Sequence, residues 1–274
     1  MVLVSLVIFA SIPPLVAGAS TAPLVVIVLE NQPASQILGN PDAPFINSIV
    51  QHGHSFSNYR AITNGSLSNY LAMTAGITSK NTNAPNLFQA LDAAGTSWTE
   101  FEESETGICT GATTGTVPGR RDPLYTKAHD PAIQFKNDTC KSNDVPLTST
   151  FDPTALPDFS YVVPNQCDDM HTFGSGTCPA YFGTNNATSA VAMGDRWVNT
   201  FVQQVAPYAT VLLTWDEGKR SDEHIVTVAY GLGVTQREDS APYNHYNLES
   251  GLYLYLALGT GPRGGSTALP LPLP

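Results

Sequence analysis

Short uninterrupted runs of apolar residues recur along the chain and alternate with longer segments whose apolar residues return every three or four positions. The short runs are typical of strands buried on both faces of a sheet, and the longer segments are typical of helices with one buried face. The predicted strands are residues 24–29, 97–101, 159–164, 210–214 and 224–230, and the predicted helices are residues 44–53, 66–75, 86–95, 188–205 and 243–258. Because strands and helices alternate, we expect an α/β fold with a doubly wound, mainly parallel sheet and helices on both faces.

Acidic and polar residues follow three of the predicted strands within a few positions. They are Glu30 and Asn31, then Asp168, Asp169 and His171, and finally Asp216 and Glu217. The carboxyl ends of parallel strands meet at one edge of the sheet, where ligands of such folds bind. Carboxylates that are held close together repel one another unless a cation or a proton lies between them. We therefore predict a site for one or more divalent metal ions at this edge; the alternative is a set of separate, solvated turns.

Ser66 stands where a turn signal, Asn64-Gly65, leads into a predicted helix. A hydroxyl at a helix N-terminus faces free N–H groups and the positive end of the helix dipole, which attract an anion such as phosphate. A metal ion beside it would lower the pKa of the hydroxyl and neutralise phosphoryl oxygens. These features predict phosphoryl transfer through a phosphoserine, with His171 or His245 as metal ligand or proton donor. The alternatives are a plain helix cap and a Ser-His-Asp acyl hydrolase, whose G-x-S-x-G turn needs a second glycine that the chain lacks.

The net charge of −11 and the sequence pI of about 4.8 narrow the range of partners. Such a chain repels nucleic acid and anionic membrane surfaces, so we expect neither as a partner. A small phosphorylated substrate is compatible with this charge, because bound cations invert the local field. The 274 residues, 42% of them hydrophobic, suit one large domain, which we place at residues 20–260.

The N-terminal segment points to export. Residues 1–19 are almost entirely apolar and end in Ala17-Gly18-Ala19, which fits the small-residue cleavage site of a signal peptide, although the basic residues that usually begin one are missing. An uncleaved anchor and a buried strand are the alternatives. No later segment is long and apolar enough to span a bilayer, so we predict a secreted or periplasmic protein without a stable membrane span.

Four cysteines agree with export. Cys109 and Cys140 flank one loop-rich segment, and Cys167 and Cys178 flank another. Four cysteines allow three pairings, and we favour the sequential one because each pair then closes a loop rich in Gly, Asn and Thr. A zinc site is the competing interpretation, but no C-x-x-C spacing is present. The Gly- and Pro-rich residues 261–274 are predicted to form a disordered tail.

Five motifs carry a resemblance to a known family. They are Leu29-Glu30-Asn31, the stretch from Thr63 to Gly76, the P-N-x-C-x-D-M-H stretch from Pro164 to His171, T-W-D-E-G at 214–218, and Asn244-His245-Tyr246. Together they resemble the bacterial phosphoesterase family of acid phosphatases and phospholipases C, in that family's order and over nearly all the chain after residue 23. The resemblance implies an alkaline-phosphatase-like fold and hydrolysis of phosphoric esters.

The same resemblance implies roles for particular residues. It assigns Glu30, Asn31, Ser66, Asp216 and Glu217 to the metal and nucleophile cluster, with Ser66 as the attacking group. His171 and His245 would line the site, and Asp169 would support them. His224 resembles a metal-ligand position of the wider superfamily, with an ordinary strand-edge histidine as the alternative. His129, in the sequence H-D-P, resembles a family position without a clear role.

The chain departs from the family pattern next to the nucleophile. The family has His-Pro before the serine and a proline after it, whereas this chain has Asn64-Gly65 and Ser68. Asn64 can still donate a hydrogen bond to a phosphoryl oxygen. The leading hypothesis is a secreted, metal-assisted phosphomonoesterase of the acid phosphatase type that acts on a small phosphorylated substrate. The alternatives are a phospholipase C-like phosphodiesterase and a non-catalytic exported domain that binds phosphate or metal.

Overall fold

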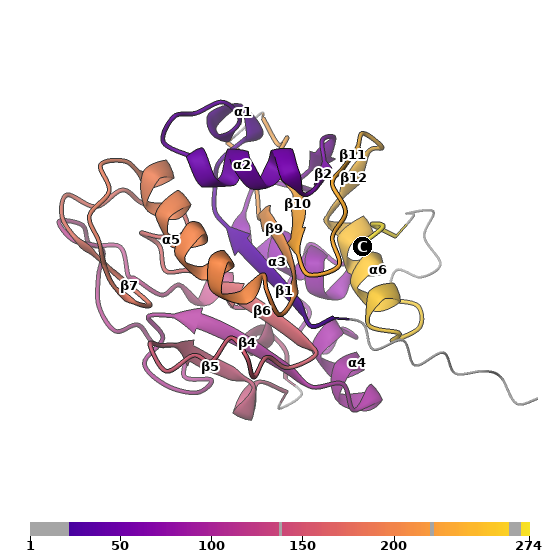
Figure 1. The fold of residues 1–274 in the computed structure, drawn as a ribbon. Helices are drawn as coiled ribbons and strands as arrows, with labels where there is room; N and C mark the ends of the chain where they lie inside the picture. Colours follow the sequence, from indigo (N-terminus) through magenta and orange to yellow (C-terminus); the bar gives the residue numbers. More distant parts are fainter. Residues whose placement is uncertain (1–21, 137–138, 220–221, 263–269) are drawn as a thin grey trace, which may run out of the picture.

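The structure is a computed structural model, and it describes residues 22–136, 139–219, 222–262 and 270–274. An eight-stranded sheet forms its centre, with the strand order β11-β2-β10-β9-β1-β6-β4-β5 (Figure 1). The strands are β1 (Leu24–Leu29), β2 (His54–Phe56), β4 (Trp98–Glu103), β5 (Asp144–Leu147), β6 (Phe159–Val163), β9 (Thr210–Trp215), β10 (Val228–Gly231) and β11 (Arg237–Asp239). The signal peptide predicted for residues 1–19 lies outside the described residues.

Parallel pairing dominates the sheet. Strand β1 pairs in parallel with β6 and β9, and β4 pairs in parallel with β6 and β5. Strand β10 runs antiparallel to both β9 and β2, while β11 is parallel to β2. The prediction of a mainly parallel α/β sheet is therefore confirmed. The strand predicted at residues 224–230 begins only at Val228, because His224 bridges to Arg60 outside the sheet.

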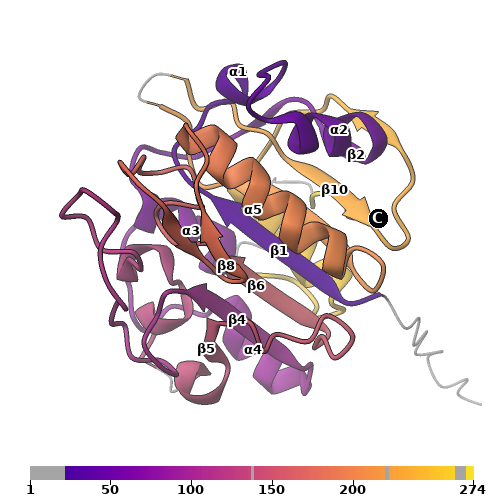
Figure 2. The same ribbon diagram turned by 60° about the vertical axis from the view of Figure 1, so that its left-hand side comes forward.

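Helices cover both faces of the sheet (Figures 1 and 2). Helix α2 contacts α5 on one face, and α3 contacts α4 and α6 on the other. The helices are α1 (Ala34–Ile37), α2 (Pro44–His52), α3 (Ser66–Ala75), α4 (Leu87–Ala94), α5 (Ala190–Val205) and α6 (His245–Tyr255). Two small sheets complete the fold, one of β3 (Tyr59–Arg60) with β12 (Tyr243–Asn244) and one of β7 (Cys178–Ala180) with β8 (Gly183–Asn185).

The core is centred on β1 and β9, whose residues are all buried. Their apolar runs place side chains on both faces of the sheet, where the helices cover them. Helix α2 is tied to α5 by Asp195, whose carboxylate accepts the N–H groups of Ile46 at 2.8 Å and Phe45 at 3.2 Å. This contact supplies the acceptor that Ala43, which precedes α2, lacks.

The long segment between residues 106 and 157 has no apolar periodicity, yet it is folded. It contains β5 and three short 3₁₀ helices, η1 (Lys127–His129), η2 (Ala132–Gln134) and η3 (Thr139–Ser142). A disulfide joins Cys109 to Cys140, and a second joins Cys167 to Cys178 in the next loop. The predicted sequential pairing of the cysteines is confirmed.

The end of the chain corrects one prediction. Leu271, within the predicted disordered tail of residues 261–274, is 1% exposed, and its N–H donates to the carbonyl of Asn247 at 2.8 Å. A side chain at Gly251 of α6 would collide with the backbone of Leu271. Disorder is therefore wrong for residues 270–274, because Leu271 fills an apolar site against α6.

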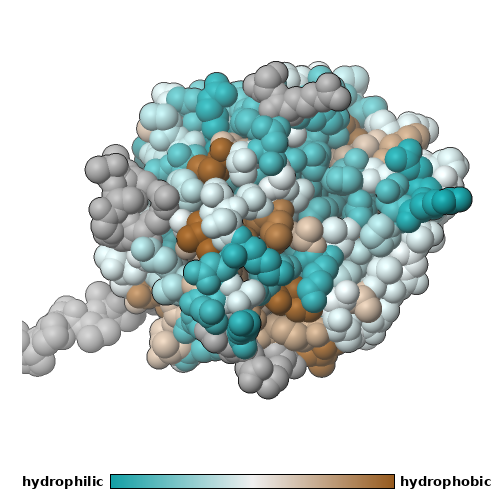
Figure 3. Space-filling view, turned by 180° about the vertical axis from the view of Figure 1, so that it is seen from behind, coloured by the Kyte–Doolittle hydropathy of each residue, from teal (hydrophilic) through white to brown (hydrophobic). Residues whose placement is uncertain are grey.

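The outer surface is mixed in character. Seen from behind, it is largely hydrophilic to neutral and carries several small apolar patches (Figure 3). Within the described residues, no helix has the length and apolarity required to cross a bilayer.

Candidate active site

Ser66 is the first residue of α3, and its hydroxyl meets a carboxylate from the end of β1. Its Oγ donates to Oε2 of Glu30 at 3.0 Å. Gly65 makes this entry into the helix, because its φ of 131° is a conformation that side chains disfavour. Ser66 is therefore not a side-chain cap; its hydroxyl is turned toward the sheet edge.

A second pair of contacts joins the ends of β1 and β9. Asn31, with a φ of 55°, donates its backbone N–H to Oδ1 of Asp216 at 3.1 Å and its Nδ2 to Oε2 of Glu30 at 2.7 Å. Asparagine tolerates this left-handed conformation better than most residues. The backbone N–H of Glu217 also donates to Asp216 Oδ1, at 2.6 Å. The two strand ends thus hold Glu30 and Asp216 in fixed orientations.

Three buried carboxylate oxygens in this region lack a hydrogen-bond donor. They are Oε1 of Glu30, Oδ2 of Asp169 and Oδ2 of Asp216. Burial raises the pKa of Glu30 well above its usual value, and the charges of Asp216 and Asp169 add to the shift. Burial, with the charge of Glu217 as a smaller cause, raises the pKa of Asp216 to about 7. Because unpaired buried carboxylates are costly, the donor set fits a hard divalent cation.

Glu217 has a contact that the sequence did not predict. Its Oε2 accepts the backbone N–H of Gly65 and, at 3.2 Å, the Nδ2 of Asn69. Asn69 is fully buried and also accepts the N–H of Ile62 at 3.2 Å, so it braces the turn before Ser66. Glu217 therefore holds the N-terminus of α3 against the end of β9.

His129 lies between two acids of the site, Glu30 and Asp169, although no role for it was predicted. Its Nε2 is 3.4 Å from Glu30 Oε1, its Nδ1 is 3.7 Å from Asp169 Oδ2, and its ring stacks on Tyr70 with centroids 5.6 Å apart. Burial, with the charge of His171 as a smaller cause, lowers the pKa of His129 to about 3. The ring is therefore neutral near pH 7, so its contacts with the two acids are not salt bridges, and a neutral imidazole can bind a metal ion.

Asp169 and His171 extend the site on its open side. The backbone N–H of His171 donates to Asp169 Oδ1 at 2.6 Å, and Nδ1 of His171 lies 2.7 Å from Oγ1 of Thr172. The His171 ring centroid is 5.9 Å from that of His129. Asn64 is exposed on the turn that precedes Ser66. These placements bring His171 and Asp169 to the cluster and leave Asn64 at its rim.

His245 is hydrogen-bonded to the backbone of Asp216. Its Nε2 donates to the backbone carbonyl of Asp216 at 2.6 Å, so its Nδ1 accepts from the hydroxyl of Tyr59 at 3.1 Å. Burial lowers the pKa of His245 to about 4. Both ring nitrogens are engaged by protein groups, so His245 holds the backbone of Asp216 in this structure, and its part in proton transfer stays a prediction.

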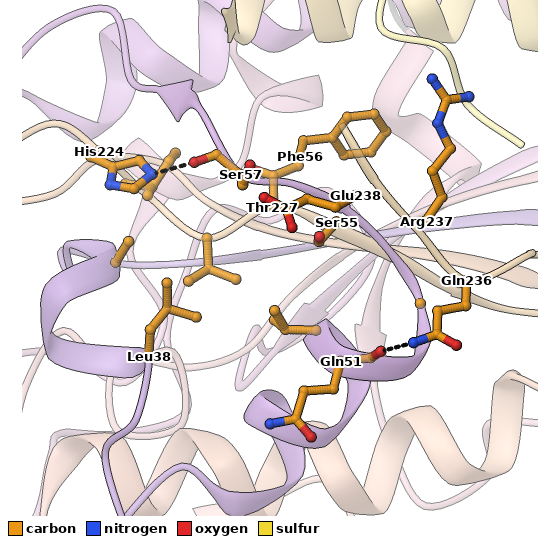
Figure 4. Close-up of a pocket in the computed structure, with 15 residues that line it drawn as sticks. Leu38, Gln51, Ser55, Phe56, Ser57, His224, Thr227, Gln236, Arg237 and Glu238 are labelled. Atoms are coloured by element: carbon orange, nitrogen blue, oxygen red, sulfur yellow. Dashed lines mark hydrogen bonds between the residues drawn. The ribbon is translucent and has the colours of Figure 1, made fainter. Parts of the chain in front are cut away.

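His224 lines a groove next to β2. Its Nε2 contacts the carbonyl of Ser57 at 2.9 Å, and it lines a groove of about 560 Å³ together with residues such as Phe56, Gln51 and Arg237 (Figure 4). None of the other residues predicted for the active site lines this groove. Nε2 of His224 is thus engaged by a backbone carbonyl, and its role as a metal ligand stays a prediction.

A sequence model of the phosphoesterase family matches residues 29–244 of the chain, a span that contains the whole cluster around Ser66. The chain belongs to the phosphoesterase family. It is 31% identical over 264 residues to a phosphatidylinositol-3-phosphatase of Mycobacterium tuberculosis, covering 88% of this chain and 80% of that protein. It is 25% identical over 263 residues to a probable acid phosphatase of Kluyveromyces lactis, covering 85% of this chain and 57% of that protein.

Solved structures share the fold of this phosphoesterase. A protein in the alkaline phosphatase superfamily from Vibrio parahaemolyticus superposes with a TM-score of 0.59 at 15% identity, covering 88% of this chain and 67% of that one. The lipoteichoic acid synthase LtaP from Listeria monocytogenes gives a TM-score of 0.61 at 9% identity, covering 89% and 74%. The resemblance inferred from the motifs is confirmed: the protein has an alkaline-phosphatase-like fold and is a hydrolase that acts on phosphoric ester bonds.

Proposed function

We propose that the protein is a secreted, metal-assisted phosphomonoesterase in which Ser66 is the nucleophile. The observation that carries the proposal is the 3.0 Å hydrogen bond from Ser66 Oγ to Glu30, beside buried carboxylate oxygens that have no donor. Such an arrangement orients the hydroxyl and leaves ligands ready for a cation.

Each residue of the cluster has a role in this reaction. Glu30, Asp169, Asp216 and His129 would hold a divalent cation, which when bound would neutralise phosphoryl charge and lower the pKa of the Ser66 hydroxyl. Ser66 Oγ attacks phosphorus as its proton passes to Glu30, and the bond from phosphorus to the leaving oxygen breaks. The N-terminus of α3 would present its first backbone N–H groups to the phosphoryl group.

The remaining residues would manage protons and water. His171 lies on the open side of the cluster, where its ring can give a proton to the leaving oxygen and take one from the water that hydrolyses phosphoserine. Asn64 at the rim would donate to a phosphoryl oxygen, and Asn31 keeps Glu30 oriented. Glu217 would act by fixing the turn that carries Ser66, with a direct metal contact as its second proposed role.

Two observations support the cellular setting and substrate class. The two disulfides fit an oxidising, extracytoplasmic compartment. The relatives from Mycobacterium tuberculosis and Kluyveromyces lactis have names that describe phosphatases, which favours a phosphomonoester over the diester of a phospholipase C. The lipid substrate in the first name makes a short-chain phosphatidylinositol 3-phosphate a natural second substrate to assay.

The test compares hydrolysis of p-nitrophenyl phosphate, bis-p-nitrophenyl phosphate and dioctanoyl phosphatidylinositol 3-phosphate, before and after treatment with chelator. We expect turnover of a monoester that depends on divalent metal and disappears in Ser66→Ala. Ser68→Ala, two residues along the same helix, is the matched control. Faster turnover of the diester would favour the phosphodiesterase, and binding of phosphate without turnover under any metal would favour the non-catalytic domain.

A further inference from the structure

Five buried acidic side chains gather at the edge of the sheet formed by β4 and β5, apart from the residues around Ser66. Glu100 and Glu102 come from one face of β4, Asp144 begins β5, and Glu105 and Asp130 come from the adjoining loops. All five are at most 2% exposed. Carboxylate oxygens of Glu100, Glu102 and Asp130 lie within 4.8 Å of one another, as do those of Glu105, Asp130 and Asp144. We call these five residues the edge cluster.

Protein donors orient three of these carboxylates from outside. Oε2 of Glu100 accepts the N–H of Ala132 at 3.0 Å. Oε1 of Glu105 accepts the N–H groups of Thr110 at 2.7 Å and Gly111 at 2.8 Å. For Asp130, Oδ2 accepts the hydroxyl of Tyr125 at 2.6 Å, and Oδ1 accepts the N–H of Ile133 at 3.1 Å. These hydrogen bonds fix the direction of each group, as outer hydrogen bonds do for metal ligands.

Five other oxygens of the edge cluster have no donor. Oε1 of Glu100, Oε1 of Glu102, Oε2 of Glu105 and both oxygens of Asp144 are buried without a hydrogen-bond partner. Among the described residues, no lysine, arginine or histidine forms an ion pair with any of the five. Several like charges therefore share one buried space without compensation.

From this geometry we propose that the edge cluster binds a hard divalent cation, Ca²⁺, as a structural site separate from the catalytic one. Carboxylate oxygens alone form the donor set, which is what Ca²⁺ prefers and what zinc and copper do not. Cys109 and Cys140 lie beside Asp144 but are joined in a disulfide, so no thiolate is on offer. The hydroxyls that reach the site, those of Tyr125 and Thr110, donate to Asp130 and Glu105, so the site differs from the cluster around Ser66.

The position of the site explains what it would stabilise. It joins β4, β5 and the loops that carry Glu105 and Asp130. The disulfide reaches the same place, because the N–H of Cys109 donates to the carbonyl of Asp144 at 3.0 Å. A bound cation would replace like-charge repulsion by attraction at the point where these segments meet.

Protons shared between the carboxyls are the competing way to hold the edge cluster together. Burial, together with the charges of Asp130 and Glu105, raises the pKa of Asp144 to about 9. In that case the five groups would need no cation, and added Ca²⁺ would change nothing. Calcium binding and thermal stability distinguish the two states.

The experiment uses the full chain carrying Asp216→Asn, which weakens cation binding at the catalytic cluster, after removal of metal by chelation. Isothermal titration calorimetry should show that one Ca²⁺ binds per chain. Thermal unfolding should show that added Ca²⁺ raises Tm. Adding Glu102→Gln and Asp144→Asn should weaken this binding at least about tenfold and abolish the rise in Tm. After chelation, the Tm of the protein with the double substitution should equal or exceed the Tm of the protein without it, because fewer like charges remain.

A second measurement does not depend on the double variant folding. Tb³⁺ replaces Ca²⁺ at oxygen sites, and Tyr125, whose hydroxyl contacts Asp130, should sensitise its luminescence. Ca²⁺ should quench this signal by displacement, and Tyr125→Phe should remove most of it. Ca²⁺ binding and a Tm shift that survive Glu102→Gln with Asp144→Asn would overturn the proposal, and so would a chelated protein that neither binds Ca²⁺ nor gains stability from it. Turnover of Ser66→Ala tests the proposed catalytic function and does not depend on Ca²⁺ binding at the edge cluster. Either proposal can therefore be contradicted without the other.

Discussion

Two of the buried groups of carboxylates among the described residues, the one around Ser66 and the edge cluster, differ in their surroundings. Around Ser66, Glu30 contacts a hydroxyl and a neutral imidazole, which also approaches Asp169, and the group is exposed at His171. The edge cluster has neither a serine hydroxyl nor an imidazole, and backbone N–H groups and a tyrosine close it from outside.

In both groups, buried carboxylate oxygens without a donor favour a bound cation. They do not define the role of that cation. Both groups have orphaned oxygens and pKa values raised by burial. Only the group around Ser66 adds a nucleophile at a helix N-terminus, and that addition turns a cation site into a reactive one. Substitutions that change one group and leave the other intact therefore test both proposals.

The largest effect is expected from Ser66→Ala. Removing Oγ removes the atom that would bond to phosphorus, so kcat should fall at least ~10³-fold, as it does when other hydrolases lose their nucleophile. Hydrolysis of p-nitrophenyl phosphate measures this, and trapping of a phosphorylated Ser66 peptide by mass spectrometry in the wild type confirms the intermediate. Unchanged turnover in Ser66→Ala would remove Ser66 from the mechanism. The rise of Tm with Ca²⁺ should be the same as in the wild type.

Asp216→Asn should have the next largest effect. The substitution keeps an oxygen to accept the N–H groups of Asn31 and Glu217 but removes the negative charge. Turnover should fall ~10²-fold, and part of it should return at high metal concentration, because weaker affinity and not lost chemistry causes the fall. Asp92→Asn, on α4, is the control. A fall that no metal concentration reverses would argue for a role of Asp216 other than holding the cation.

Glu217→Gln should reduce activity about tenfold, as expected for a residue that positions others. Its Oε2 accepts Gly65 N–H and Asn69 Nδ2, so a neutral amide weakens the bracing of the turn before Ser66. The metal concentration for half-maximal activity separates the two roles proposed for Glu217. If that concentration is unchanged, Glu217 acts through the turn; if it rises strongly, Glu217 is a ligand.

The sequence predicted the strands that are buried on both faces of the sheet. The apolar runs of β1 and β9 required cover on both faces, and their acidic ends had to meet at one edge of a parallel sheet, so Glu30 and Asp216 could be found by pattern alone. The sequence T-E-F-E-E of β4 instead resembles a strand with one solvated face. The segment of residues 106–157 covers that face, so Glu100 and Glu102 are buried.

His129 was beyond pattern reasoning for a related reason. It lies in a single 3₁₀ turn within the irregular segment, where no periodicity fixes the direction of a side chain. Its place beside Glu30 and Asp169 depends on contacts between distant parts of the chain, among them its stacking on Tyr70. The family resemblance marked the H-D-P sequence but could not supply this geometry.

The smallest effect is expected from Tyr125→Phe, which acts on the edge cluster alone. The substitution removes the hydroxyl that donates to Asp130 at 2.6 Å and leaves that buried oxygen without a donor. A lost hydrogen bond to a buried charged group costs about 1–3 kcal/mol, so the Tm of the chelated protein should fall by several degrees. Ca²⁺ should recover part of the loss, because the freed oxygen can then face the cation.

Tyr208→Phe, at a tyrosine that is 46% exposed, is the matched control and should change Tm little. Turnover of Tyr125→Phe, measured with metal present, should stay within about twofold of the wild type, because the hydroxyl of Tyr125 touches no residue of the catalytic cluster. If Tyr125→Phe instead lowered kcat as strongly as Asp216→Asn, the two groups of carboxylates would be one coupled site reaching from β4 to Ser66, and the distinction between a structural and a catalytic cation would have to be given up.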